Sequence, residues 1–512
     1  MNRTRRNILL GTAAAGTAAI VLPQALAWAG NSKIRYPFTL GVASGEPSPD
    51  GIVLWTRLAP KPFEADAGMP SRDVEVEWEI ADDEGFRKVV RRGEDVAWQV
   101  FGHSVHVELG GLEPHTWYWY RFKVDGHVSP VGRTRTAPAP GTSPEFRFGF
   151  ASCASYEYGY YTAYERMAEE DFDLIVFLGD YIYEYGVETN HVRQNYAPPY
   201  PCMSVEDYRM RFAQQKVEPE VQQVHAAAPW LPTWDDHELL NDYSGMYSPY
   251  AWTDEEFALR RRNAYRAYYE NMPLRKSTLP HGIDMRVYRS LDYGDLARFV
   301  VLDTRQYRDP QACRGGIKTC PEAADPARRF LGNDQEQWVY GQLDSSPARW
   351  NVIAQQVFLS AIDESAGTAQ SFSMDSWSGY SATRDRLLSH IQATGTSNPI
   401  VLTGDVHAHY VSDIKANFND PGSASIGAEF VVTSITSETD GADARPTWPL
   451  LQQENPHLKY HSFRRGYGAT TVGKDTLTTE MKILPYVSTK GAPVSTGATF
   501  VVENGVGGVV RA

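Results

Sequence analysis

Two residues with metal-binding side chains, Asp405 and His407, stand two positions apart in the sequence Thr-Gly-Asp-Val-His. The apolar residues 399–402 come directly before this sequence and predict a buried strand. A carboxylate and an imidazole at the mouth of a strand can both point at a metal ion. Alone, this motif is weak evidence for a metal site.

Two further apolar segments end in motifs of the same kind. Asp180 and Tyr183 follow the segment 174–178, and the sequence Trp-Asp-Asp-His-Glu, with Asp236 and His237, follows a second segment. Catalytic groups often lie at the carboxyl ends of neighbouring strands in α/β folds. Three such motifs together predict one composite metal site.

The composition sets limits on the function. A chain of 512 residues is too long for one ordinary core, so we expect two domains. The net charge of -14 argues against a nucleic-acid-binding surface and against a polybasic membrane contact. It does not exclude phosphorylated substrates, because bound cations can invert the local field.

The first residues resemble an export signal. Arg5 and Arg6 form a twin-arginine pattern before a mildly apolar stretch at 9–22, which predicts a signal peptide over residues 1–30. A membrane anchor is the alternative, but a span needs about 20 strongly apolar residues. We therefore expect a periplasmic or secreted protein, exported by the twin-arginine machinery and without a stable anchor.

The chain has four cysteines. Cys313 and Cys320 enclose a flexible Gly-Gly loop, and an exported protein can keep disulfides, so we predict a bridge between them. Cys153 ends the predicted strand 146–152, where it is positioned as a ligand; a buried apolar thiol is the alternative. Cys202 is predicted to be unpaired, with no assigned role.

The N-terminal part, residues 36–137, reads as all-β. Apolar and polar residues alternate at 74–80 and 104–109. Residues 112–122 combine a turn with alternating aromatics, as in the tyrosine corner of fibronectin-type sandwiches. The Pro-rich segment 136–144 is typical of a linker and predicts a domain boundary.

Beyond the linker, strands alternate with helices. A strand at 146–151, a helix at 159–170 and a strand at 174–178 form a predicted βαβ unit. A capping box of Thr253 and Glu256 opens a helix that ends before Pro273. We expect further strands at 297–302, 351–355, 400–402 and 429–433.

These motifs, together with Ala-Ser-Gly-Glu-Pro at 43–47 and Val-Leu-Trp-Thr-Arg at 53–57, resemble those of the PhoD-type alkaline phosphatases, within the calcineurin-like metallophosphoesterases. The resemblance runs essentially from end to end. It implies a multi-domain protein with a fibronectin-like sandwich at 36–137. It also implies an α/β metallophosphoesterase domain at 138–512, with a central β-sandwich flanked by helices.

The resemblance further implies a ferric iron site. Asp180 takes the position of the carboxylate that bridges two metals, and Tyr183 that of a phenolate ligand; a core tyrosine is the alternative. Cys153 replaces the Asp that opens the wider superfamily pattern, as is typical of the PhoD type. His407 is the fourth expected ligand of the iron.

Two other departures from the superfamily favour calcium. Asp236 stands where Asn is usual and Asp405 where His is usual, and both changes supply hard anionic oxygen. Gln356 stands near an expected His, either as an amide ligand or as a structural residue. Asn241 and Asp242 could complete a calcium shell.

The catalytic side chain implied by the resemblance is His237, which would stabilise the reacting phosphorus and protonate the leaving oxygen; a core histidine is the alternative. Glu238 is expected to orient its ring. We interpret His409 as a solvated loop histidine. Arg305 would hold a phosphate or pair with Asp303.

The resulting hypothesis is a monomeric, exported hydrolase of phosphate mono- or diesters, in which Fe³⁺ and Ca²⁺ activate a water or hydroxide for in-line attack. A phospholipase D-like phosphodiesterase and a non-catalytic envelope-binding protein are the alternatives. Aromatic residues near the motifs are mostly expected to pack, although some could wall a pocket for an apolar leaving group: Tyr156, Tyr158, Tyr160, Tyr161, Tyr181 and Tyr185.

Overall fold

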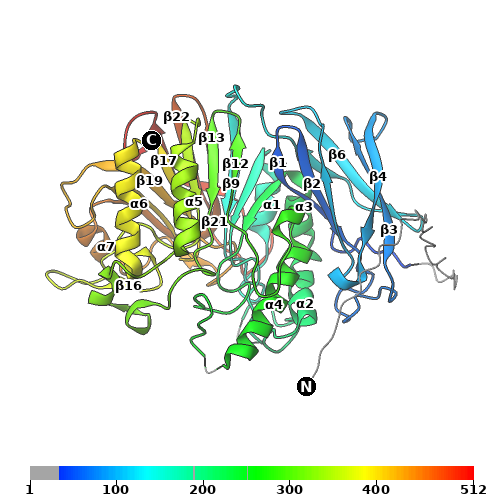
Figure 1. Cartoon of the computed structure of the whole chain (residues 1–512), viewed down its shortest axis with the longest axis horizontal. Helices are drawn as coiled ribbons and strands as arrows, with labels where there is room; N and C mark the ends of the chain where they lie inside the picture. Colours follow the sequence, from blue (N-terminus) through cyan, green and yellow to red (C-terminus); the bar gives the residue numbers. More distant parts are fainter. Residues whose placement is uncertain (1–33, 188–190, 251) are drawn as a thin grey trace, which may run out of the picture.

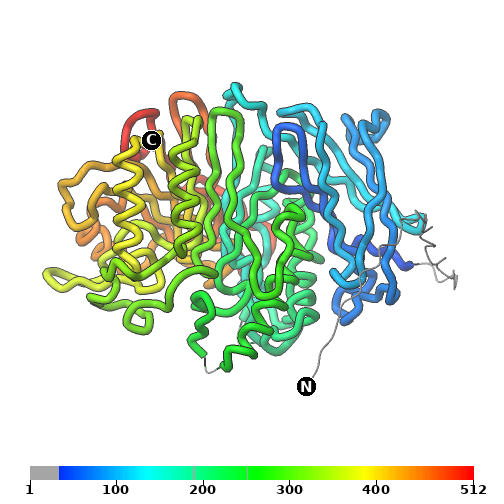
Figure 2. The backbone as a smooth tube through the Cα atoms, viewed as in Figure 1, coloured from blue at the N-terminus to red at the C-terminus, as the bar shows by residue number. Residues whose placement is uncertain are grey.

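A computed structural model describes residues 34–187, 191–250 and 252–512 (Figure 1). The predicted signal peptide, residues 1–30, lies outside this part of the chain. Among the described residues, none of the helices has the length and apolar character needed to cross a bilayer. Figure 2 shows the chain passing from an N-terminal β domain in blue, at one end, to helices and strands in yellow and orange at the other.

The N-terminal domain consists of two facing antiparallel sheets. One sheet contains β1 (Val42–Ser48), β2 (Gly51–Arg57) and β5 (Ser104–Leu109). The other contains β3 (Val74–Ala81), β4 (Val89–Ala97), β6 (Trp117–Val124), β7 (His127–Val128) and β8 (Gly132–Arg135).

The alternating sequence of these strands explains the packing. Leu54 of one sheet and Val76 and Tyr120 of the other are buried in a shared core, while the intervening polar residues face outward. The hydroxyl of Tyr118 accepts a hydrogen bond of 3.0 Å from the backbone N–H of Glu113, which ties the start of β6 to the preceding turn. A parallel bridge from Gly45 to Trp230 is one of the contacts that join this domain to the C-terminal part.

Two mixed sheets form the centre of the C-terminal part. The first contains β11 (Trp230–Thr233), β10 (Leu174–Leu178), β9 (Phe146–Ala151), β21 (Leu458–Val472), β22 (Thr476–Leu484), β23 (Ser495–Glu503) and β24 (Val510–Arg511). The second contains β12 (Arg289–Tyr293), β13 (Ala297–Val301), β15 (Trp350–Ala354), β17 (Pro399–Thr403), β19 (Ser425–Val431) and β18 (His409–Lys415). The long strand β21 belongs to both sheets, because its first half pairs with β18.

Helices cover the outer face of each sheet (Figure 1). The first sheet packs against α1 (Thr162–Glu169), α2 (Val205–Lys216), α3 (Pro219–Ala227) and α4 (Asp254–Asn271), and the second against α5 (Gly332–Asp344) and α6 (Ser381–Thr394). A short helix, α7 (Trp448–Glu454), precedes β21. The predicted central sandwich flanked by helices is therefore present.

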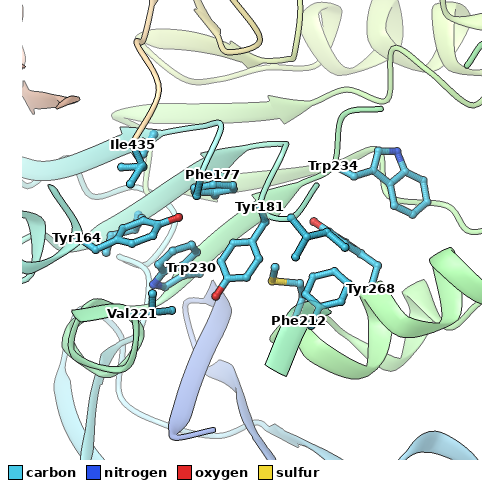
Figure 3. Close-up of a cluster of buried hydrophobic side chains, with 14 of the residues drawn as sticks. Tyr164, Phe177, Tyr181, Phe212, Val221, Trp230, Trp234, Tyr268 and Ile435 are labelled. Atoms are coloured by element: carbon cyan, nitrogen blue, oxygen red, sulfur yellow. The ribbon is translucent and has the colours of Figure 1, made fainter. Parts of the chain in front are cut away.

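Burial on both faces accounts for the continuous apolar segments. In β10, Val176 faces the core between the sheets, while Phe177 faces the helices. Figure 3 shows this helix-facing layer, in which Phe177 stacks on Trp230 at 5.6 Å and Phe212 of α2 lies close by. Burying one such aromatic side chain contributes roughly 1.5–3 kcal/mol.

The predicted element limits are close to those observed, with one instructive difference. The capping box of Thr253 and Glu256 opens α4, as predicted. The helix expected from residue 159 instead begins at Thr162. The backbone N–H of Tyr160 donates to the carbonyl of Val487 at 2.8 Å, so tertiary contact holds the preceding residues out of the helix.

Strands β9, β10 and β11 run parallel, as do β13, β15, β17 and β19. Their carboxyl ends therefore lie along one edge of the sandwich. A parallel bridge between Ser152 and Ser434 joins the loops that leave β9 and β19. This edge brings together all three motifs from the sequence.

Candidate metal centre

The backbone is strained where these loops leave the strands. Cys153, Asp180, Asp405 and His407 adopt φ values of 60°, 56°, 61° and 55°. For residues other than glycine this left-handed conformation costs about 1–2 kcal/mol each. Strain of this kind persists where surrounding structure enforces it, and it concentrates at functional sites. Four of the predicted site residues share it.

The first group of side chains, the sulfur-containing cluster, consists of Cys153, Asp180, Tyr183 and His407. The Sγ of Cys153 and the Oη of Tyr183 lie 3.5 and 3.3 Å from Oδ2 of Asp180. The Oη of Tyr183 is also 3.1 Å from Nε2 of His407 and accepts a 2.7 Å hydrogen bond from Ser437. Four different donor types thus converge on one point.

The chemistry of this cluster fits a metal ion. Burial, reinforced by Asp180, raises the pKa of the Cys153 thiol well above its usual value. Burial also raises the pKa of the Tyr183 hydroxyl. The anionic forms that bind metals are therefore unfavourable here by themselves, and a cation would supply the missing compensation.

The second group, the carboxylate cluster, consists of Asp236, Asp242 and Asp375, together with Asp405, which is linked to them through Arg305 at 3.5 Å. The carboxylates of Asp236, Asp242 and Asp375 have oxygens within 4.8 Å of one another. Oδ1 of Asp236 is buried without a hydrogen-bond partner. Burial raises the pKa of Asp405 well above its usual value and that of Asp242 to about 6. Clustered oxygens of this kind suit a hard cation.

Two buried arginines lie behind the carboxylate cluster. Arg305 is fully buried, with its guanidinium 2.8 Å from Asp375 and 3.4 Å from Asp236. Burial alone would raise the pKa of Asp375, but Arg305 and Arg308 outweigh it and lower that pKa. Arg305 was expected to hold phosphate or to pair with Asp303. Both expectations are wrong, because its side chain is committed to the site carboxylates.

Asp180 connects the two clusters. Its Oδ2 faces Cys153 and Tyr183, while its Oδ1 accepts a 3.3 Å hydrogen bond from the backbone N–H of His237. Ligand atoms of Asp180, Asp236 and His237 also lie within 4.8 Å of one another. One carboxylate therefore reaches both groups of ligands.

The ring of His237 is held by Glu184. Its Nδ1 lies 2.8 Å from Oε2 of Glu184, whose other oxygen accepts from the backbone of Asn241 at 2.8 Å. Burial alone would lower the pKa of His237, but the carboxylates of Glu184, Asp180 and Asp236 outweigh it and raise that pKa well above its usual value. Glu184 thus fixes the ring of His237, and the surrounding carboxylates favour its protonated form.

The expectation that Glu238 orients His237 is wrong. Glu238 accepts three backbone hydrogen bonds, from Asp180 at 3.0 Å, Tyr181 at 2.7 Å and Asp235 at 2.9 Å. These bonds occupy both carboxylate oxygens. Glu238 instead ties the loop after β10 to the loop after β11.

Other predicted residues are structural. His409 is buried rather than solvated, because it lies 3.1 Å from the carbonyl of Lys482 and accepts from the backbone of Thr433. Gln356 binds Thr304 through its amide oxygen at 2.7 Å, which supports the structural alternative. The predicted disulfide between Cys313 and Cys320 is present, and Cys202 is buried and free.

Two site residues escaped the sequence reasoning. Asp375 lies in a loop after the short strand β16 (Phe372–Ser373) and has no motif around it. Glu184 directly follows Tyr183, and an acidic residue next to a strand-exit motif was the sequence feature that could have identified it.

The chain is similar to known phosphatases along most of its length. The family model of PhoD-like phosphatases matches residues 148–481, and the model of their N-terminal domain matches residues 24–138. Alkaline phosphatase D of Bacillus subtilis (strain 168) is 48% identical over 475 residues, which cover 91% of this chain and 81% of that relative.

Solved structures agree. A structure of PhoD superposes with a TM-score of 0.91 at 47% identity, over 93% of this chain and 92% of the other. The purple acid phosphatase PPD1 from yellow lupin seeds superposes with a TM-score of 0.54 at 15% identity, over 91% and 74% of the two chains. The latter shows a shared fold alone.

Proposed function

Because the chain belongs to the PhoD-like phosphatase family, we propose that its two clusters hold ferric iron and calcium and together hydrolyse phosphate esters. The protein is a phosphoric ester hydrolase similar to alkaline phosphatase D, since the 48% identity covers 91% of the chain. One observation carries the proposed site: the Asp180 carboxylate reaches both clusters.

Ferric iron is assigned to the sulfur-containing cluster. A thiolate from Cys153, a phenolate from Tyr183, an imidazole from His407 and the Asp180 carboxylate would hold it. The contacts of 3.1–3.5 Å among these side chains support the assignment. The high pKa values of the thiol and the phenol mean that iron binding releases protons.

Calcium is assigned to the carboxylate cluster. Asp236 and Asp405 are the proposed ligands from the sequence, which also offered Asp242, and Asp375 joins them through its position beside Asp236 and Asp242. Calcium takes six to eight oxygen ligands and tolerates irregular geometry, which a set of carboxylates on different loops can supply. The buried Oδ1 of Asp236, which lacks a partner, supports a cation here.

When bound, the metal ions supply positive charge that lowers the pKa of a water and stabilises the phosphoryl oxygens. His237 acts on the leaving group. Glu184 fixes the ring through Nδ1, which leaves Nε2 for the substrate, and its carboxylate favours the protonated ring. His237 would donate this proton to the leaving oxygen, so that the alcohol departs neutral. Monoesters and diesters both fall within this proposal, because they share the phosphoryl group.

The remaining parts of the proposal concern the whole chain. A signal peptide over residues 1–30 would direct a monomer through the twin-arginine machinery to the periplasm or the medium. The N-terminal β domain over residues 36–137 would be of the fibronectin type, which the hydrogen bond from Glu113 to Tyr118 supports.

Metal analysis of the purified protein tests the site. We expect iron and calcium in the wild type and loss of iron in Cys153→Ser. The matched control is Cys202→Ser, because Cys202 is an equally buried free cysteine outside both clusters. An active protein that contains zinc alone, or equal iron in both variants, would contradict the assignment.

A further inference from the structure

Asp375 belongs to the carboxylate cluster although no motif surrounds it, and an earlier segment of the chain holds it in place. This segment is the disulfide ribbon, residues 311–320, which the disulfide closes. Within the ribbon, β14 (Ile317–Lys318) pairs antiparallel with β16. The backbone N–H of Met374 also donates to the carbonyl of Gly316 at 3.0 Å. The ribbon therefore holds the backbone up to the residue directly before Asp375.

The first residue of the ribbon reaches the carboxylate cluster itself. The Nε2 of Gln311 donates to Oδ1 of Asp375 and to the backbone carbonyl of Asp242, both at 2.8 Å. Its Oε1 accepts a hydrogen bond of 3.2 Å from the hydroxyl of Ser244. Gln311 is buried. One side chain of the ribbon thus links the Asp375 carboxylate to the loop that carries Asp236 and Asp242.

The disulfide closes the ribbon between these two contacts. Cys313 stands two residues after Gln311, and Cys320 stands two residues after the end of β14. Cys320 is buried in a small cluster with Met374, and Cys313 packs against the same cluster. The bridge therefore connects the part of the ribbon that binds the Asp375 carboxylate to the part that holds its backbone.

The backbone of the ribbon is in a conformation that needs a constraint. Four consecutive residues have φ values of 49°, 63°, 75° and 78°, namely Cys313, Arg314, Gly315 and Gly316. This left-handed conformation is ordinary for the two glycines but unfavourable for Cys313 and Arg314. Such strain persists only where the surrounding structure enforces it. The covalent bond at Cys313 is such a constraint.

Packing braces the ribbon only in part, because two recesses border it. Ile317 and Asp375 line a recess of about 250 Å³. Thr319 and Met374 line a second recess of about 700 Å³. Ile317 is also 57% exposed, although it is apolar. With open space next to the ribbon, the bridge takes over part of the role that packing has in a core segment.

We propose that the disulfide ribbon positions Asp375 for calcium, with the bridge between Cys313 and Cys320 holding the ribbon in shape and Gln311 orienting the carboxylate. This inference rests on the proposed function, which assigns calcium to the carboxylate cluster. The sulfur-containing cluster comes from the loops after β9, β10 and β17, which the ribbon does not include. Loss of the bridge should therefore weaken calcium binding and leave iron binding unchanged.

Calorimetric titration with calcium tests the proposal on the iron-loaded protein, after calcium has been removed with a chelator. In the double variant Cys313→Ser with Cys320→Ser, the Kd of calcium should rise about tenfold, the lower end of the scale for partners that orient metal ligands. The iron content should match that of the wild type. An unchanged Kd, or a parallel loss of iron, overturns the inference. A wild type that binds no calcium would instead refute the proposed function.

Thermal unfolding separates positioning from stability in general. Loss of a disulfide lowers the Tm of the calcium-free protein whatever the role of the bridge. The increase in Tm on adding calcium depends on the ratio of the calcium concentration to the Kd. This increase should be smaller in the double variant than in the wild type at the same calcium concentration. Cys202→Ser, which removes a buried cysteine outside the ribbon, should keep the increase of the wild type. An equal increase in the double variant contradicts the inference.

A second variant tests the ribbon with its disulfide intact, and it also serves if the double variant does not fold. Gln311→Met keeps the length of the side chain but cannot donate to Asp375, so the Kd of calcium should again rise about tenfold. The matched control is Gln214→Met, because Gln214 is buried on α2 and binds Asn195 and Ala197, which belong to neither cluster. This control should keep the Kd of the wild type. An unchanged Kd in folded Gln311→Met overturns the inference.

Discussion

The sulfur-containing cluster and the carboxylate cluster lie on the same edge of the sandwich but balance their charge in different ways. In the first, Cys153 and Tyr183 have raised pKa values, and the donors bind one another. In the second, against the effect of burial, Arg305 lowers the pKa of Asp236, and Arg305 and Arg308 lower that of Asp375, whereas burial raises the pKa values of Asp405 and Asp242. The donors of the first cluster must lose protons to bind a metal, whereas the second contains two carboxylates, Asp236 and Asp375, whose ionised form is favoured beforehand.

This difference in donor type and charge balance explains how one site would hold two different cations, iron and calcium. Soft and phenolic donors that give up protons bind tightly and discriminate strongly between metals. Carboxylates that share their charge with arginines bind a hard cation more loosely. Asp180 reaches both clusters, so the two proposed metal sites share one carboxylate.

Removal of calcium should have the largest effect and tests the comparison directly. A calcium chelator should abolish activity, because it empties only the carboxylate cluster. The visible absorption of a ferric phenolate at Tyr183 should persist. Activity and the visible spectrum, recorded before and after calcium is restored, check this expectation. Simultaneous bleaching would show that the two clusters do not differ in affinity.

Replacement of His237 should come next in size. His237→Ala should lower kcat by roughly two to four orders of magnitude, the usual scale for a lost proton donor. Iron and calcium contents should stay near those of the wild type, because His237 is not among the proposed ligands of either metal. Steady-state kinetics and metal analysis measure both quantities. Loss of metal with unchanged activity per loaded molecule would place His237 among the ligands instead.

The glutamates Glu184 and Glu238 have different roles: Glu184 positions the ring of His237, and Glu238 holds two loops together. Glu184→Gln should lower kcat about 10–100-fold, the scale for a partner that orients a catalytic group, with the Tm little changed. Glu238→Gln should mainly lower the Tm, because an amide cannot accept all three backbone hydrogen bonds, and one unsatisfied group costs about 1–3 kcal/mol.

Kinetics and thermal unfolding of the two variants sharpen this distinction. If Glu238→Gln lowered kcat without lowering the Tm, Glu238 would have to orient the ring of His237 after all.

Tyr183→Phe should have the smallest effect on stability. The variant loses the hydrogen bond from Ser437, which is worth about 1 kcal/mol. The fold should therefore persist while the visible band bleaches. Denaturant unfolding and absorbance measure both effects. A band that survives in the variant would remove Tyr183 from the iron site.

Local sequence alone indicated which acidic residues lie at the strand exits. Apolar segments that are buried on both faces stand out as continuous runs, and Asp180, Asp236 and Asp405 come shortly after them. The capping box at Thr253 and the disulfide between Cys313 and Cys320 were equally local, because their partners are a few residues away.

Tertiary structure alone decided which side chains contact and hydrogen-bond one another. Asp375 reaches Asp236 only because two sheets bring separate loops together, and no spacing in the sequence encodes that contact. The partner of His237 is Glu184 and not Glu238 for the same reason. Three backbone N–H groups from different loops donate to Glu238, so its carboxylate is occupied, and Glu184 binds the ring of His237. The sequence determines which residue types stand near the end of a strand. The hydrogen-bond partners of these residues depend on the directions in which the packed strands point their side chains and loops.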